Sequence, residues 1–155
     1  MEDLPEYYLY RRMLPSQFDK RQGQPKSILF QLRENEDGLS VFDSNVKSPR
    51  EVLQLYIDNN NLALINGDET AQLAARKRLT EYPDVEAMVD KGWMIVKIPK
   101  SAVTDLGLIL SEVDENGHVL ILGGEKFNDI YPPLFINMLI RGVASLASRE
   151  ECLRI

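Results

Sequence analysis

The sequence predicts an α+β fold, with a mixed, largely antiparallel sheet of five or six strands packed against two to four helices. Short apolar and aromatic segments bounded by Gly, Pro, Asn and Asp occur towards both ends of the chain, as expected for strands joined by turns. Between them, residues 48–90 carry helix-start signals and helical spacing of apolar side chains. No repeat or linker divides the chain, so residues 1–155 are interpreted as a single globular domain.

The N-terminal part predicts three strands. YYLYRRM at residues 7–13 is rich in aromatic residues, which favour strands. Residues 15–25 are polar and contain Gly23, which indicates a loop. Residues 27–33 and 39–42 predict the second and third strands, and the short polar turn between them predicts an antiparallel hairpin.

The middle of the chain predicts helices. Ser48, Pro49 and Glu51 form a capping-box sequence, so a helix is expected to begin at Pro49. We expect it to end near Asn59, the first of three consecutive asparagines, with residues 61–66 left ambiguous between strand and helix. Further helical segments are expected at residues 68–80, 83–92 and 100–107.

The last third predicts two more features of the sheet and one long helix. Residues 92–99 predict a strand, and residues 108–122 predict a hairpin with Asn116-Gly117 in a type I′ turn. Because both faces of this hairpin are apolar, we expect it in the middle of the sheet or between two layers. The apolar segment 133–148 predicts a central helix, whose surplus apolar surface favours a protein partner or a homo-oligomer.

Composition excludes several classes of protein. The net charge of −6 argues against a general nucleic-acid binder and leaves only contact through a local basic patch. A lone cysteine, Cys152, indicates an ordinary thiol and a reducing compartment, so we expect a cytoplasmic protein. The sequence has neither a secretory signal nor an apolar segment long enough to span a bilayer, and no membrane association is expected.

His118 is the only histidine. If Asn116 and Gly117 form the turn, Glu115 lies opposite His118, and a cross-strand pair of these two is the simpler interpretation; a catalytic or ligand-binding role is the alternative. A single imidazole without a carboxylate motif does not predict a metal site. Gly123-Gly124 lacks the known phosphate-loop patterns and is interpreted as a turn, so no cofactor is expected.

Positive charge gathers in one segment of this acidic chain. Residues 9–26 carry a net charge of +4. Arg11 and Arg12 are adjacent in a predicted strand and must point to opposite faces. The simpler interpretation is one structural ion pair and one solvated edge residue. The alternative is a site for a phosphate or an acidic partner surface, and its residues would be Arg11, Arg12, Lys20, Arg21 and Lys26.

The segments LYRRMLP, SILFQL, GLSVF, GWMIVKIP, LGLIL and GHVLILGG, in this order over most of the chain, resemble an uncharacterised family of small bacterial proteins. The resemblance implies a setting in bacterial defence or toxin–antitoxin systems. On this basis, the expected function is that of a non-enzymatic accessory or protein-interaction component of such a multi-component system.

The order Arg11, Ser40 and Glu125 is similar to that in ADP-ribosyltransferase-like toxins, which use an arginine on the first strand, a serine on a later strand and a glutamate near a final strand. The chain departs from that pattern because it lacks Ser-x-Ser and because Glu125 is expected in a loop. The resemblance implies, as an alternative, a small ADP-ribosyltransferase-like enzyme with Arg11, Ser40 and Glu125 as catalytic candidates. A phosphate-ligand-binding enzyme is the related alternative, and His118 joins the catalytic candidates because of its place at a strand end.

Overall fold

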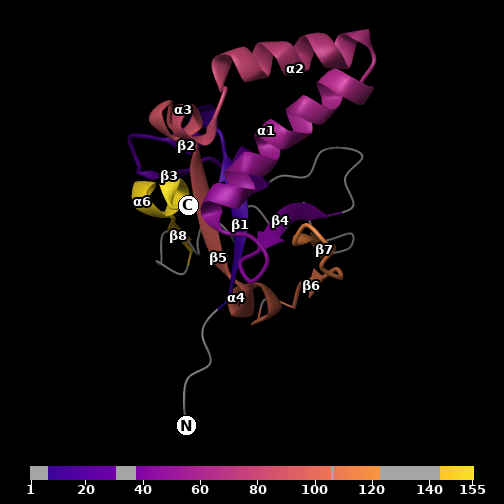
Figure 1. The fold of residues 1–155 in the computed structure, drawn as a ribbon. Helices are drawn as coiled ribbons and strands as arrows, with labels where there is room; N and C mark the ends of the chain where they lie inside the picture. Colours follow the sequence, from indigo (N-terminus) through magenta and orange to yellow (C-terminus); the bar gives the residue numbers. More distant parts are fainter. Residues whose placement is uncertain (1–6, 31–37, 106, 123–143) are drawn as a thin grey trace.

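The computed structural model describes residues 7–30, 38–105, 107–122 and 144–155 (Figure 1). Their strands form a six-stranded sheet in the order β6-β7-β4-β1-β5-β8, and every ladder in it is antiparallel. The predicted α+β class and strand number are confirmed. The strands of this sheet are β1 (Tyr8–Met13), β4 (Leu39–Asp43), β5 (Met94–Pro99), β6 (Ile109–Leu110), β7 (His118–Leu122) and β8 (Ser145–Leu146).

A two-stranded ribbon, β2 (Phe18–Asp19) and β3 (Gln24–Pro25), lies within the predicted loop 15–25. The α-helices are α1 (Pro49–Asn66), α2 (Glu69–Glu81), α3 (Val85–Asp90), α4 (Lys100–Asp105) and α6 (Arg149–Leu153). Two 3-10 turns, η1 (Pro15–Gln17) and η2 (Ser27–Phe30), follow β1 and β3. In the described part of the chain, no helix has the length and apolar character needed to cross a membrane.

Each face of the sheet carries its own buried cluster. On one face, alternate residues of the strands pack with Leu29 of η2 and Val103 of α4. On the other face, Tyr10, Phe42 and Ile95 pack with residues of α1, α3 and α6. This division follows from the strand period of two, which sends neighbouring side chains to opposite faces. The helices α1, α3 and α6 therefore cover the face towards which Tyr10 and Phe42 point (Figure 1).

The strand predicted at residues 27–33 is wrong for its first four residues, which form η2. The amide of Leu29 donates to the Lys26 carbonyl (3.1 Å), closing a tight turn instead of a ladder. This turn places the Leu29 side chain in the core, 1% exposed. Consequently β4 pairs with β1 and β7, and the predicted hairpin partner for β4 is absent from residues 27–30. Residues 31–33 lie outside the described residues.

Helix α1 begins as predicted, with the Ser48–Glu51 capping box, but continues to Asn66 instead of ending near Asn59. The buried Asn60 side chain donates to the Tyr56 carbonyl (2.8 Å) inside the helix, so this asparagine does not redirect the chain. The distal turns of α1 pack against α2. The ambiguous segment 61–66 is therefore helical.

The 108–122 hairpin differs from its prediction in position and in turn type. β6 is the edge strand of the sheet, and Ile109 is 65% exposed, so the hairpin does not lie at the centre. A type I′ turn needs positive φ at both central residues. No described non-glycine residue has a positive φ, so Asn116 excludes this turn; Gly117 alone has φ +78°. Asp114 Oδ1 instead accepts the amides of Asn116 (2.8 Å) and His118 (2.9 Å).

The helix predicted at 133–148 lies largely outside the described residues. At its C-terminal end the prediction is wrong, because residues 145–146 form β8, which pairs with β5. The amide of Ala147 donates to the Ile95 carbonyl (2.9 Å), so the chain is extended here. Ser148 then caps α6 in a second capping box, with Glu151.

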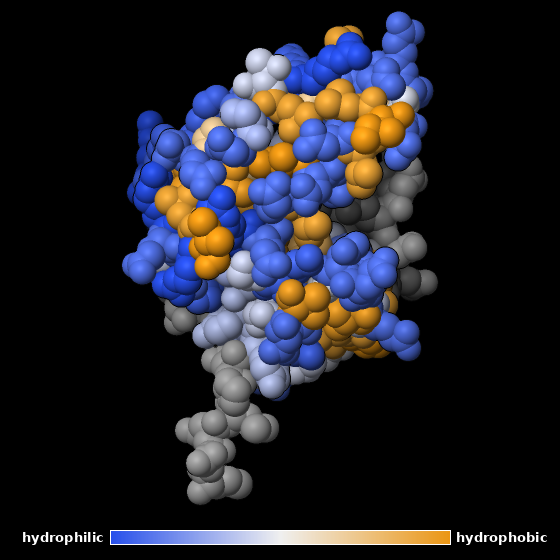
Figure 2. All heavy atoms as spheres, in the orientation of Figure 1, coloured by the Kyte–Doolittle hydropathy of each residue, from blue (hydrophilic) through white to orange (hydrophobic). Residues whose placement is uncertain are grey.

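Helices α1 and α2 form an antiparallel hairpin that extends away from the sheet (Figure 1). Their remote turns leave large apolar side chains in solvent: Leu62, Ile65 and Leu73 are 54%, 75% and 67% exposed. Figure 2 shows hydrophobic surface over this hairpin. The basic residues 76–78 of α2 are exposed on the same hairpin.

Candidate functional site

Arg12 lies in the middle of the sheet, because β1 is flanked by β4 on one side and β5 on the other. The prediction that one of the two arginines is a solvated edge residue is therefore wrong for Arg12, which is half-buried on the face covered by α1. Its guanidinium NH1 donates to the Val52 carbonyl of α1 (3.0 Å). The guanidinium carbon lies 5.5 Å from the centre of the Phe42 ring and 5.9 Å from that of Tyr56.

Beside Arg12 is a cavity of about 230 Å³. It is smaller than the roughly 300–1,000 Å³ typical of drug-sized ligand pockets, and its size suits a small ligand or a single side chain. Its lining residues come from η1, η2, α1, the strands β1 and β4, and the positions just before η1 and β5: Arg11, Arg12, Leu14, Gln17, Leu29, Ser40, Phe42, Tyr56 and Trp93. Aromatic rings form part of the wall, and Tyr56 packs on Trp93 with ring centres 4.7 Å apart.

The charge of Arg12 is not balanced by a carboxylate among the described residues; its partners are one carbonyl and two rings. Burial lowers the pKa of Arg12, and Tyr56 acts in the opposite direction. An arginine nevertheless keeps its proton. Arg12 lines the cavity, and none of its nitrogens is both fully buried and without a partner.

Arg11 reaches the same cavity from the neighbouring position. Its Nε donates to the Leu29 carbonyl (2.7 Å) and its NH1 to the Ser40 carbonyl (2.7 Å). These bonds tie β1 to η2 and β4, so much of the Arg11 guanidinium is used to hold the backbone that surrounds the cavity.

The structure brings together two other candidates, Ser40 and His118. Ser40 Oγ lies 2.5 Å from His118 Nε2, and Ser40 also lines the cavity. Asp114 Oδ2 lies 3.8 Å from His118 Nδ1, and the imidazole packs on Phe42 with ring centres 5.5 Å apart. The expected pairing of His118 with Glu115 is wrong, because Glu115 lies at the tip of the turn and Asp114 takes its place.

The basic loop residues lie elsewhere. Lys20, Arg21 and Lys26 are exposed on or beside the β2–β3 ribbon and do not belong to the described lining of the Arg12 cavity. Asp19 Oδ1 accepts the Arg21 amide (2.9 Å), which shapes the turn. Thus only the two arginines of the predicted basic site meet at one cavity.

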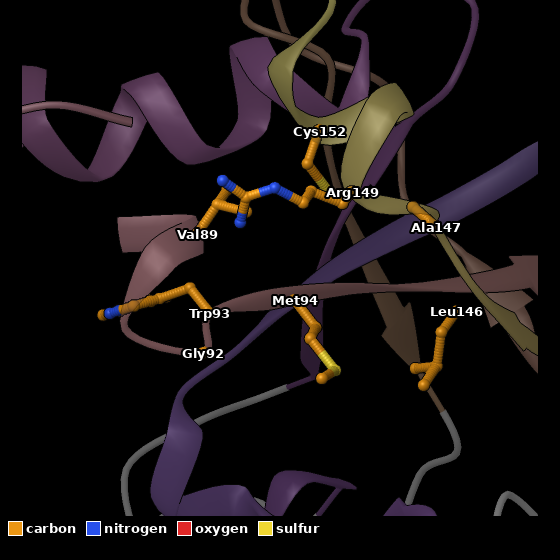
Figure 3. A pocket seen from close by; sticks show the side chains of 8 residues that line it. All are labelled: Val89, Gly92, Trp93, Met94, Leu146, Ala147, Arg149 and Cys152. Carbon is orange, nitrogen blue, oxygen red and sulfur yellow. The ribbon is translucent and has the colours of Figure 1, made fainter. Parts of the chain in front are cut away.

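A second cavity, of about 220 Å³, lies between α3, β5, β8 and α6. Figure 3 shows Cys152 and Arg149 reaching it from α6, and Met94 and Leu146 from β5 and β8. Burial is the main cause that raises the pKa of the Cys152 thiol to about 11, so at neutral pH the sulfur is not a nucleophile. The prediction of an ordinary thiol agrees with this environment.

The described residues contain no group of three or more His, Cys, Asp or Glu side chains that could hold a metal ion. Of the residues in the ADP-ribosyltransferase-like pattern, Arg11 and Ser40 are joined through the Ser40 carbonyl, and Glu125 lies outside the described residues.

Several residues of the site were not singled out from the sequence. Phe42, Tyr56, Trp93 and Gln17 line the cavity but read as ordinary core or loop residues. The sequence did offer a signal for Phe42. Tyr10 and Arg12 share one face of β1, and if β1 pairs with β4, Phe42 can lie on that same face; in the structure, Tyr10 lies opposite Phe42. The sequence offered no such signal for Tyr56 and Trp93, because the contact between their rings depends on how α1 crosses the sheet.

No protein-family model, curated protein or solved structure matches this chain.

Proposed function

We propose that the protein binds a small anionic ligand, whose carboxylate or phosphate group pairs with Arg12 in the cavity of about 230 Å³. One observation carries the proposal: the half-buried Arg12 lines a cavity and has no carboxylate partner in the described part of the chain. Uncompensated buried charge is costly, so an arriving anion would satisfy it with charge-assisted hydrogen bonds. The rings of Phe42 and Tyr56 provide flat apolar walls for the remainder of the ligand.

Thermal unfolding with inorganic phosphate tests this proposal. Phosphate at 20 mM with a Kd of ~1 mM would stabilise the folded protein by about 1.8 kcal/mol. For a chain of this size that corresponds to a rise in Tm of roughly 4–7 °C. Sodium chloride at equal ionic strength serves as the salt control and should not reproduce the rise.

Two variants locate the effect. Arg12→Met should abolish the phosphate-dependent rise in Tm. The triple replacement of Lys20, Arg21 and Lys26 by serine should retain it, because these side chains lie outside the described lining of the cavity. A rise that survives in Arg12→Met, or that disappears only in the triple variant, would place anion binding on the loop and contradict the proposal.

A protein-interaction role is the second candidate, and the α1–α2 hairpin favours it. Leu62, Ile65 and Leu73 form exposed apolar surface next to the basic residues 76–78. Apolar surface with a basic rim suits a partner protein that presents an apolar patch with acidic residues around it. The bacterial, defence-related setting of such a partner is proposed from the sequence resemblance alone.

Replacing Leu62, Ile65 and Leu73 together by serine tests the interaction role. These side chains are largely in solvent, so the variant should fold and should lose a partner captured by the wild-type protein from cells of the source. Light scattering of the wild type at rising concentration separates a hetero-complex from self-association. A wild type and variant that capture the same proteins would exclude the hairpin as the interface.

A further inference from the structure

Ser40, which lines the cavity, is in close side-chain contact with His118. The separation of 2.5 Å between Ser40 Oγ and His118 Nε2 is at hydrogen-bond distance, and Ser40 lines the same cavity as Arg12. A serine hydroxyl becomes a useful nucleophile when a neighbouring base can take its proton. The pair therefore has the first requirement of serine-dependent chemistry, which is a nucleophile and a base in direct contact.

The strand register explains why the pair meets. β4 and β7 are antiparallel, with Ser40 opposite Leu120 and Phe42 opposite His118. Ser40 and His118 are thus diagonal neighbours on one face of the sheet, a distance that longer side chains can bridge. The Phe42 ring packs on the imidazole and restricts its rotation.

Asp114 occupies the other side of the imidazole. Its Oδ1 is fixed by the backbone amides of Asn116 and His118, and its Oδ2 lies 3.8 Å from His118 Nδ1. A carboxylate on this side favours the tautomer with a proton on Nδ1, which leaves Nε2 free to accept the proton of Ser40. Hydrogen bonds of catalytic groups are often long before substrate binds, and they shorten in the complex.

We propose that Ser40 is a nucleophile and His118 its general base, and that together they hydrolyse small esters whose anionic group is held by Arg12. The choice of an anionic ester rests on the proposed function, because it assigns the same cavity to the substrate. Asp114 is a positioning residue, which orients the imidazole.

The reaction uses only the ester and water. Ser40 Oγ bonds to the ester carbonyl carbon while His118 Nε2 takes the hydroxyl proton. The bond from that carbon to the alkoxy oxygen then breaks, and the leaving alcohol receives the proton from His118. A water molecule next bonds to the acyl carbon and gives a proton to His118. The bond to Ser40 Oγ breaks, Ser40 regains the proton from His118, and the carboxylic acid product leaves and gives up its own proton to solvent.

A fluorescent fluorophosphonate tests the nucleophile, because an activated serine displaces its fluoride and remains labelled. The full chain should be labelled at Ser40, as located by peptide mass spectrometry, and p-nitrophenyl acetate should give a burst of about one p-nitrophenolate per chain. His118→Gln should label about 100-fold more slowly, the lower range of general-base effects. Asp114→Asn keeps a side-chain oxygen for the turn amides and removes the charge, and it should also label more slowly.

Ser111→Ala is the matched control. Ser111 is half-buried and its hydroxyl accepts the Leu120 amide (2.8 Å), as befits a structural serine. Ser40→Ala should therefore lose the label and Ser111→Ala should keep it, with folding of each variant checked by circular dichroism. Absence of both label and burst in the wild type, or labelling of Ser40 that His118→Gln leaves unchanged, would overturn the inference and identify the pair as a structural hydrogen bond.

The two proposals fail in different ways. Stabilisation by phosphate without any label at Ser40 retains anion binding and overturns the hydrolytic role. Inorganic phosphate should also slow labelling of the wild type, since both occupy one cavity, but should not slow labelling of Arg12→Met. Labelling that saturating phosphate does not slow would overturn the assignment of an anionic substrate to this cavity.

Discussion

Arg12→Met separates a functional arginine from a structural one. The substitution removes one charge-assisted hydrogen bond to the Val52 carbonyl, worth about 1.5–3 kcal/mol. It also removes contacts with two rings, whose distances of 5.5 and 5.9 Å are near the limit for cation–π attraction and suggest about 0.5 kcal/mol each. The expected loss from these contacts is about 2.5–4 kcal/mol.

The opposing contribution is of similar size. Holding a guanidinium away from water without a carboxylate costs several kcal/mol, and replacing buried ions by apolar side chains of similar volume is often neutral or stabilising. Burial is also the main cause that lowers the pKa of Arg12, because burial disfavours the charged form of the side chain. We therefore expect Arg12→Met to change the free energy of unfolding by no more than about 1 kcal/mol.

Urea unfolding followed by tryptophan fluorescence measures this change, because Trp93 is the only tryptophan and is 2% exposed. Arg50→Met is the matched control: Arg50 donates to the Leu153 carbonyl (3.0 Å) and pairs with Glu86 (2.7 Å), so its removal should destabilise modestly and leave phosphate binding intact. A loss above about 3 kcal/mol in Arg12→Met, with phosphate binding retained, would refute the reasoning and make Arg12 a structural residue.

Three further changes have defined outcomes. Gly107→Ala should lower the free energy of unfolding by about 1–2 kcal/mol, because of its positive φ alone. Gly117→Ala should cost at least about 1 kcal/mol more, because its Cβ would also lie 2.7 Å from the Val46 side chain. Chemical denaturation of the two variants measures the difference. Burial raises the pKa of Glu151, but hydrogen bonds from Ser148 and the charge of the Lys97 ammonium lower it by more, so the net shift is downward. Glu151 therefore adds stability above pH 4.5 that is lost as pH falls through the lowered pKa, and Glu151→Gln should flatten that part of the pH–stability curve. Cys152 should react with iodoacetamide at pH 8 at least about 100-fold more slowly in the folded than in the unfolded protein, as mass spectrometry can measure.

Local signals in the sequence predicted much of the fold. Ser48 with Glu51, and Asp68 before α2, are side-chain caps that act within one turn, and both helices begin there. The strand at residues 94–99 and the helix beginning at Lys100 also follow from short apolar patterns. Such features depend on neighbouring residues and so can be inferred without tertiary structure.

The errors have a common origin in distant contacts. Asn60 remains helical because α2 supports the outer turns of α1, and Leu29 leaves the extended conformation because the core accepts its side chain. The site was predictable to the same extent. The sequence showed that Arg11 and Arg12 point to opposite faces of a strand, but it did not show that β4, α1 and β5 supply the neighbours of Arg12. Ser40 and His118 were each chosen from the sequence, but for unrelated reasons. Their contact depends on the pairing of β4 with β7, which the sequence did not predict.

The central position of β1 has a consequence for synthesis of the chain. β1 precedes both of its neighbours, and the residues between Met13 and Met94 must be made before β5 can pair with it. At about 5–20 residues per second this takes roughly 4–16 s, during which one edge of an aromatic strand lacks its final partner on the ribosome. Charged residues within apolar strands oppose aggregation of such intermediates. Arg11 and Arg12 are charged residues of this kind, placed in the strand that waits for its second neighbour.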